Sequence, residues 1–190
     1  MHTEYEVRIL EINKEELIEK LNKLGAKKID EFDYKRRVYN FNPAVDYKWI
    51  RLRTDGNKTT LTIKKIEKLS IDGTKEMEIE VSDFEETNNI LQELGYKSHT
   101  YQENKRIRYV LNDVELDIDT WPYIPTYLEI EGKDEESVKQ MMKLLEVEES
   151  QVTTLDVQGV FKEFYNIDIA GVSIVKFGEK LDEKYYLKKW

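Results

Sequence analysis

Charged residues of a single sign recur at every second position along most of the apolar stretches of this chain. The rows are Glu76, Glu78 and Glu80; Glu115, Asp117 and Asp119; Arg51 and Arg53; and Arg106 and Arg108. An apolar residue separates successive charges, and this period of two predicts β-strands with one charged and one apolar face. Like charges that neighbour each other on a sheet repel. The rows therefore favour a charged face that serves a ligand, and the alternative is a charged face that is only solvated.

The spacing of apolar residues divides the chain into strands and helices. Alternation marks eight strands, near residues 3–10, 34–41, 48–54, 58–66, 75–82, 103–111, 113–119 and 126–132. Helical periodicity marks Lys14–Leu24 and residues 83–94, 135–145 and 154–165. If the sheet closes on itself, the charged faces line a lumen and the apolar faces take the helices. We predict an α+β fold: a closed eight-stranded antiparallel β-barrel, or tunnel, with a charged lumen and helices packed outside.

Turn residues and a weak internal repeat support this organisation. Gly25 and Gly95 follow predicted helices at positions where a left-handed C-cap favours glycine, and Asn112-Asp113 is a candidate two-residue hairpin turn. At an offset of 70 residues, Lys35-Arg36-x-x-Tyr39 matches Lys105-Arg106-x-x-Tyr109. Each half then has a strand, a helix and three strands. We predict one domain over residues 1–170, with 171–190 as a C-terminal tail.

Composition excludes several classes of protein. The formal net charge of −9 leaves no excess of cations for a nucleic-acid backbone. The absence of cysteine excludes disulfides and thiolate chemistry. No apolar run reaches the length of a membrane span. We therefore expect a cytoplasmic protein that binds neither nucleic-acid polymers nor membranes.

The basic and acidic rows together point to one kind of ligand. The guanidinium of arginine holds phosphate oxygens with two parallel hydrogen bonds, which lysine cannot do. Carboxylates bind hard divalent cations through oxygen. A lumen with rows of both signs therefore suits a polyphosphate together with a divalent metal.

An ordered set of motifs resembles a known family. The set comprises Glu4-x-Glu6-x-Arg8, Arg51-Leu-Arg53, Thr62-Ile-Lys64, Glu76-x-Glu78, Lys105-Arg106-x-Arg108, Glu115-Leu-Asp117-Ile-Asp119 and Leu128-Glu129-Ile-Glu131. It resembles the CYTH superfamily, or triphosphate tunnel metalloenzymes, over roughly residues 3–165. That superfamily includes class IV adenylate cyclases, thiamine triphosphatases and inorganic triphosphatases.

The resemblance implies roles for individual residues. The ligands of Mg²⁺ or Mn²⁺ would be Glu4, Glu6, Asp117, Glu129 and Glu131. The triphosphate would be bound by Arg8, Arg51, Arg53, Lys64, Arg106 and Arg108, with Glu76 and Glu78 orienting these bases or joining a second metal. The catalytic set would be Glu4, Glu6, Arg8, Arg53 and Lys64. Arg8 replaces the lysine that ends the ExExK signature, which keeps the positive charge and excludes a neutral amine there.

The predicted activity is metal-dependent hydrolysis of an inorganic or small organic triphosphate. Tripolyphosphate, thiamine triphosphate and ATP are the candidate substrates. One alternative is cyclisation of ATP to cyclic AMP and pyrophosphate, as in class IV adenylate cyclases, and a further alternative is a non-catalytic polyphosphate- or nucleotide-binding module. A homodimer is left open. For His2 and His99 we expect surface positions. For Tyr39, Trp49 and Trp121 we favour core packing; the alternatives are a pairing of Tyr39 with Lys64, which the resemblance implies, and a place at the tunnel mouth for the two tryptophans.

Overall fold

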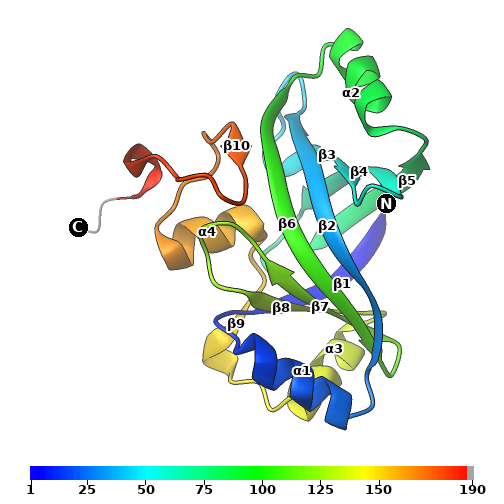
Figure 1. The fold of residues 1–190 in the computed structure, drawn as a ribbon. Coiled ribbons are helices and arrows are strands. Elements are labelled where there is room, and N and C mark those ends of the chain that lie inside the picture. The colour runs from blue at the N-terminus through cyan, green and yellow to red at the C-terminus, as the bar shows by residue number, and fades with distance from the viewer. Residues whose placement is uncertain (188–190) are drawn as a thin grey trace.

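Eight antiparallel strands form a closed barrel, which confirms the predicted fold. A computed structural model describes residues 1–187 (Figure 1). The strands are β1 (His2–Ile9), β2 (Lys27–Asn40), β3 (Lys48–Thr54), β4 (Thr59–Ile66), β5 (Thr74–Val81), β6 (Ser98–Leu111), β7 (Val114–Thr120) and β8 (Tyr127–Gly132). Neighbouring strands follow the order β6-β2-β3-β4-β5-β1-β8-β7, and the pairing of β7 with β6 closes the circle.

The two halves of the chain build the two halves of the barrel. The first half runs β1, α1 (Lys14–Lys23), β2, β3 and β4, and the second runs β5, α2 (Phe84–Glu93), β6, β7 and β8. Each strand of the first half has its counterpart in the same place of the second half, so that β1 corresponds to β5 and β2 to β6. When every strand is exchanged with its counterpart, all the barrel pairings are reproduced, including the pairing of β1 with β5 and that of β2 with β6. The topology therefore has the pseudo-twofold arrangement that the repeat predicts.

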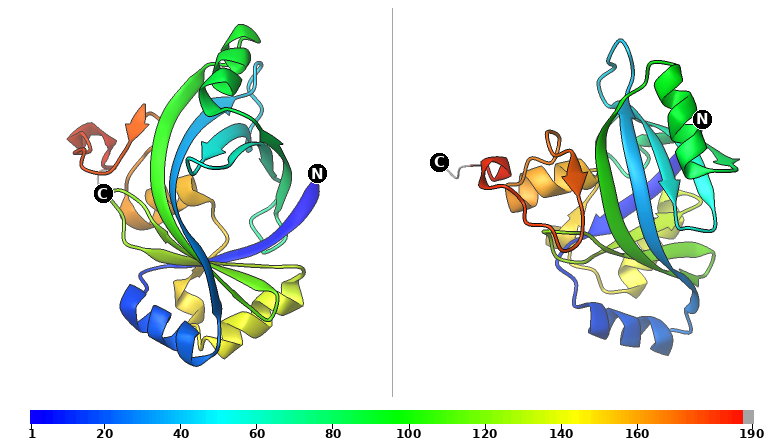
Figure 2. Two further views of the ribbon diagram at one scale, coloured as in Figure 1. Left: turned by 45° about the vertical axis from the view of Figure 1, so that its right-hand side comes forward. Right: turned by 45° about the horizontal axis from the view of Figure 1, so that its top comes forward.

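Strands β2 and β6 are longer than predicted. The sequence-based starts at residues 34 and 103 were wrong, because β2 begins at Lys27 and β6 at Ser98. Residues 27–33 show no regular alternation and are mostly exposed. These residues adopt a strand conformation because their backbone pairs with β6, from Lys27 opposite Val110 to Asp33 opposite Lys105. The two strands lie side by side along the barrel (Figures 1 and 2).

Local capping sets the helix and turn boundaries close to the predicted positions. Asn13 caps α1 by accepting a hydrogen bond from the Glu16 amide. The next residue after each C-cap of α1 and α2 is a glycine with positive φ: 79° at Gly25 and 90° at Gly95. Asn112 and Asp113 both have positive φ and join β6 to β7 in the predicted hairpin.

The helices cover the apolar outer faces of the strands. Helices α1 and α3 (Glu135–Leu144) lie together at one end of the molecule and α2 lies at the other (Figure 2). Val7, Leu116 and Ile130 of the barrel pack with Leu21 of α1 and Val138 of α3 in the largest core. None of the helices within residues 1–187 is long and apolar enough to span a membrane.

A second core lies under α4 (Val157–Tyr165), where the chain continues into its last segment. Helix α4 begins three residues later than Thr154, the predicted start, because Asp156 acts as its N-cap. Val172 and Val175 are buried beside Phe161 and Trp121. Short strand β10 (Ile174–Val175) pairs parallel with β6, and β9 (Val152–Thr153) pairs with β1. The domain boundary at residue 170 stays a prediction, and residues 188–190 lie outside the described part of the chain.

Candidate active site

The barrel encloses a cavity of about 990 Å³, a volume suited to a small-molecule ligand. The charged side chains that the barrel strands contribute to its wall are Glu4, Glu6, Arg8, Arg36, Lys48, Arg51, Arg53, Lys64, Glu76, Glu78, Arg106, Arg108, Glu115, Asp119, Glu129 and Glu131. The predicted inward orientation is therefore confirmed for the members of the charged rows among them, whereas Asp117 and Glu80 of the predicted acidic rows do not line the cavity. On β3, for example, Arg51 and Arg53 face the cavity while Ile50 and Leu52 are buried in the core outside it.

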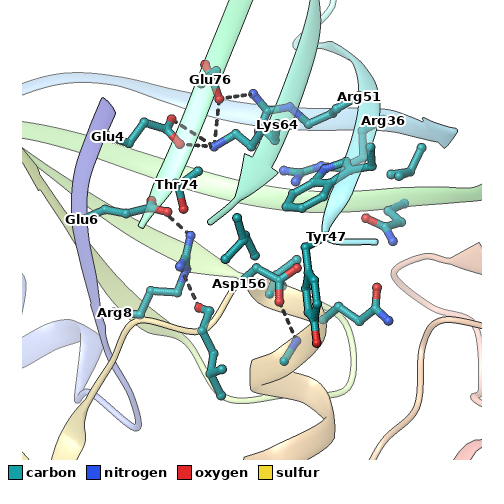
Figure 3. A pocket seen from close by; sticks show the side chains of 18 of the residues that line it. Glu4, Glu6, Arg8, Arg36, Tyr47, Arg51, Lys64, Thr74, Glu76 and Asp156 are labelled. Carbon is teal, nitrogen blue, oxygen red and sulfur yellow. Dashed lines mark hydrogen bonds and ion pairs between the residues drawn. The ribbon is translucent and has the colours of Figure 1, made fainter. Parts of the chain in front are cut away.

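Lys64 on β4 joins acidic residues of two other strands. Its Nζ lies 2.9 Å from Oε2 of Glu4 and 2.8 Å from Oε2 of Glu76, and Arg51 lies 3.6 Å from the same Glu76 oxygen (Figure 3). Burial opposes the charge on Lys64, but Glu4 and the other acids raise its pKa above the ordinary value. Lys64 is thus held protonated and acts as a fixed cation. We call Lys64, Glu4, Glu76 and Arg51 the Lys64 cluster.

Arg106 on β6 is surrounded by acids. Its guanidinium donates to Asp119 at 2.7 and 2.6 Å, to Asp117 at 2.5 Å and to Glu129 at 2.9 Å. Arg108 donates to Asp117 at 2.8 and 2.6 Å. Asp117, a predicted metal ligand, lies between the two arginines and does not line the cavity. Its contacts within the barrel are those of an ion-pair network.

Arg8 on β1 is almost fully buried and connects the barrel wall to the segment before α4. Its Nη2 lies 2.6 Å from Glu129 and 3.2 Å from Glu6, and its Nη1 donates to the Leu155 carbonyl at 2.7 Å. Figure 3 shows Arg8 between Glu6 and this segment. The two terminal nitrogens of the guanidinium share these partners, whereas a lysine would present all its donors from a single atom.

Three carboxyl groups crowd together on one side of the cavity, although Glu4 also pairs with Lys64 and Glu6 with Arg8. Glu6 and Glu131 are directly opposite each other in the β1–β8 ladder, an arrangement that costs stability when both are ionised. Burial, followed by the charges of Glu129 and Glu6, raises the pKa of Glu131 to about 7. Burial and the neighbouring Glu6 and Glu76 raise the pKa of Glu4 to about 8, although Lys64 opposes the shift. We call Glu4, Glu6 and Glu131 the acidic pole.

The acidic pole has the donor chemistry that a divalent metal requires. Within residues 1–187, no three carboxylate or histidine side chains converge closely enough to hold an ion as they stand. The three carboxylates are hard oxygen donors, and a cation would relieve their mutual repulsion. Glu4, Glu6 and Glu131 therefore fit Mg²⁺ or Mn²⁺, whereas Glu129 already compensates Arg8 and Arg106.

The opposite side of the cavity carries basic residues, and one of them, Arg36, was not predicted as a site residue. Arg36 on β2 lines the cavity and is directly opposite Arg53 on β3. Burial and the charges of Arg51 and Arg53 depress the pKa of Arg36 well below its ordinary value. We call Arg36 and Arg53 the basic pole. The repeat already contained the signal, because Arg36 is the counterpart of Arg106.

Aromatic and uncharged polar side chains complete the wall. Trp49 and Trp121 both line the cavity. Trp121 also packs in the core with 3% exposure, as predicted, whereas Trp49 is only partly buried and belongs to no core cluster within residues 1–187, so its predicted core packing was wrong. Tyr39 is fully buried and donates to Asn88, as its predicted packing role requires. His99 was predicted at the surface, and this was wrong. Because β6 begins at Ser98, the side chain of His99 is half-buried in the wall of the cavity.

Comparison with known proteins agrees with this geometry. The family model of the CYTH domain matches residues 2–158. The PH1012 protein of Pyrococcus horikoshii is 24% identical with a TM-score of 0.72, covering 80% of this chain and 96% of its own. A candidate adenylate cyclase from Vibrio parahaemolyticus has the same TM-score at 11% identity, covering 85% and 98%.

A third solved structure is more distant. It is a Hippeastrum protein described as having a dominant triphosphatase activity, with 16% identity and a TM-score of 0.59, covering 86% of this chain and 96% of its own. At these identities the structures establish a shared fold. No curated protein matches the sequence.

Proposed function

The chain belongs to the CYTH domain family, and from that premise we propose that it is a divalent-metal-dependent enzyme that hydrolyses inorganic or small organic triphosphates inside its barrel. The observation that carries this proposal is the separation of charge in the cavity. On one side, Arg36 has no acidic partner within salt-bridge distance among residues 1–187, and Arg53 has only Glu78 at 3.8 Å. On the other side, Glu4, Glu6 and Glu131 crowd together, although Glu4 pairs with Lys64 and Glu6 with Arg8. A triphosphate with a bound divalent cation compensates both.

The basic residues would bind and orient the phosphate chain. Arg36, Arg51 and Arg53 present guanidinium groups on neighbouring strands, and Lys64 adds a point charge held by Glu4 and Glu76. These groups are preorganised by the barrel, so they can stabilise the charge that develops on phosphate oxygens in the transition state. Hydrolysis of tripolyphosphate adds water across the terminal P–O–P bridge and yields phosphate and pyrophosphate.

The acidic pole would hold Mg²⁺ or Mn²⁺ through Glu4, Glu6 and Glu131. When bound, the metal would neutralise phosphate oxygens and polarise water. A binder without catalysis would need the cations but not this group of carboxylates, so the acidic pole favours an enzyme over a non-catalytic binding module.

Cyclisation of ATP is the second candidate, favoured by one feature. Trp49 and Trp121 both line the cavity, so an aromatic surface is present on which an organic group could pack. Most of the polar groups in the cavity nevertheless address phosphate or metal. Binding energy concentrated on the triphosphate favours substrates that consist mainly of triphosphate.

One assay separates these functions. Purified protein is given tripolyphosphate, thiamine triphosphate or ATP with Mg²⁺, Mn²⁺ or EDTA, and phosphate, pyrophosphate and cyclic AMP are all measured. We expect phosphate release from tripolyphosphate or thiamine triphosphate, and none in EDTA. Cyclic AMP and pyrophosphate from ATP, with tripolyphosphate untouched, would establish the cyclase instead. Binding of all three without turnover would establish the binding module.

A pair of variants tests the metal assignment. Glu131→Gln removes a charged oxygen ligand and relieves the repulsion with Glu6, so we expect loss of activity together with an equal or higher unfolding temperature in EDTA. Glu4→Gln should behave in the same way. The control is Glu80→Gln, because Glu80 belongs to the acidic row of β5 but is exposed and paired with Lys58 at 3.4 Å. Full activity in both cavity variants would refute the assignment.

A further inference from the structure

Arg36 is a buried cation of the cavity wall that lacks an acidic partner. It is 7% exposed. Across residues 1–187, no carboxylate lies within salt-bridge distance of its guanidinium. Its contacts are a hydrogen bond to the side-chain oxygen of Asn104 and the ring of Trp121, with Cζ 4.6 Å from the ring centroid. Its Nε is buried without a hydrogen-bond partner. Leaving such a group unpaired costs free energy, which a bound anion would recover.

The neighbours of Arg36 strengthen the case for an anion. Arg53 is directly opposite it on β3, and its nearest acid is Glu78 at 3.8 Å. Burial, and then Arg51, lower the pKa of Arg53 to about 10. Thr60, opposite Arg53 on β4, has a buried hydroxyl without a partner. Two guanidinium groups thus meet at one level of the cavity wall, and Arg36 has an unused Nε donor, whereas Thr60 does not line the cavity.

The basic pole lies apart from the Lys64 cluster. Lys64 is opposite Trp49 on β3, and Trp49 lies four residues before Arg53 on the same strand. At the usual strand rise, the backbone positions of Trp49 and Arg53 are about 13 Å apart. Arg51 lies between them along β3. The charges that act most strongly on Lys64 are those of Glu4, Arg51 and Glu6, and neither Arg36 nor Arg53 is among its main neighbours.

We propose that Arg36 and Arg53 form a phosphoryl-binding subsite, separate from the Lys64 cluster, that makes the cavity selective for the length of the phosphate chain. The inference rests on the proposed function for its ligand class. One phosphoryl group would contact Arg36 and Arg53, and another would lie near Lys64 and the acidic pole. A single phosphate reaches only one of these positions, whereas a tripolyphosphate chain extends toward both.

The test measures binding without turnover. Isothermal titration calorimetry in EDTA compares phosphate, pyrophosphate and tripolyphosphate on the wild type, Arg36→Gln and Arg37→Gln. Arg37 is the matched control, because it is the next residue on β2, faces away from the cavity, and contacts Glu85 at 3.5 Å and the rings of Phe84 and Tyr101.

We expect Arg36→Gln to weaken tripolyphosphate binding about 10- to 100-fold, the scale of a lost charge-assisted hydrogen bond. The preference for tripolyphosphate over pyrophosphate should shrink by about tenfold or more, again on the scale of that bond. Arg37→Gln should keep both the affinity and the preference. Arg36→Lys, which restores charge without the planar fork, should recover part of the affinity. An equal loss for all three anions, or no loss, would overturn the subsite.

Thermal unfolding distinguishes this role from a structural one. In anion-free buffer, Arg36→Gln should unfold at the same or a higher temperature, because it removes an uncompensated charge opposite Arg53. A clear decrease would mean that Arg36 serves mainly to pack on Trp121, and would refute the subsite.

The two proposals can fail separately. Tripolyphosphate that binds but is not hydrolysed contradicts only the proposed function, and hydrolysis with an unchanged length preference in Arg36→Gln contradicts only the subsite.

Discussion

The β6–β7 pair and the β2–β3 pair occupy equivalent places in the two halves of the barrel, but their charges are arranged differently. In β6–β7, Arg106 is opposite Asp119 and Arg108 is opposite Asp117. In β2–β3, Arg36 is opposite Arg53 and Arg51 is opposite Val38. The same topology therefore places a cation against an anion in one half and a cation against a cation in the other.

This difference separates two uses of a buried arginine. Arg106 has its charge neutralised within the protein by three carboxylates, so it holds strands β6, β7 and β8 together. Arg36 has an equivalent position and no such compensation, so its charge is available to a ligand. A motif search treats both as basic strand residues, and only their partners distinguish the structural role from the binding role.

The largest expected effect is a loss of stability from a change in the β6–β7 pair, where the charge of Arg106 is neutralised within the protein. Arg106→Gln leaves Asp117, Asp119 and Glu129 buried without their shared counter-charge, and removal of one partner of a buried network costs about 3–5 kcal/mol. Urea unfolding of the metal-free protein measures the loss. If Arg106→Gln is no less stable than Arg36→Gln, the two arginines have equivalent roles and the comparison fails.

A smaller effect, on activity and not on stability, is expected in the other half. Arg53→Ala removes one preorganised group that stabilises phosphate charge, so turnover should fall by about 10²-fold. The free energy of unfolding should hold or rise, because Arg36 loses its repulsive neighbour. Steady-state kinetics on tripolyphosphate and thiamine triphosphate should give the same factor, since the lost contact is to phosphate. Wild-type turnover would remove Arg53 from the site.

The smallest effect tests the comparison directly by making one half resemble the other. Arg53→Asp places an acid opposite Arg36, as Asp119 is opposite Arg106, and should raise the free energy of unfolding by about 1 kcal/mol, the scale of a cross-strand charge pair. The same variant should lose tripolyphosphate binding, because the basic pole is neutralised. Denaturant unfolding and calorimetry give the two results. A variant that is destabilised yet still binds would show that the charge on Arg36 is not the determining quantity.

Much of the site could be predicted from local pattern, because a strand alternates with a strict period of two. Once Leu52 is assigned to the core, Arg51 and Arg53 must face the other side. The same reasoning oriented Glu4, Glu129 and most of the other predicted residues toward one lumen, with Asp117 as the exception. The capped helices and the Asn112-Asp113 turn were also predictable, since each depends on interactions within a few residues.

The sequence by itself determined the orientation of most charged strand side chains, while only the tertiary structure decided which of their charges are compensated. Compensation depends on register between strands that are far apart in the chain, such as β6 with β7 and β8 around Arg106. The same long-range pairing extended β6 far enough to bring His99 into the wall. Orientation follows from a backbone period that is local, whereas the electrostatic free energy of a buried charge depends on every group within a few ångströms of it, whatever its position in the sequence.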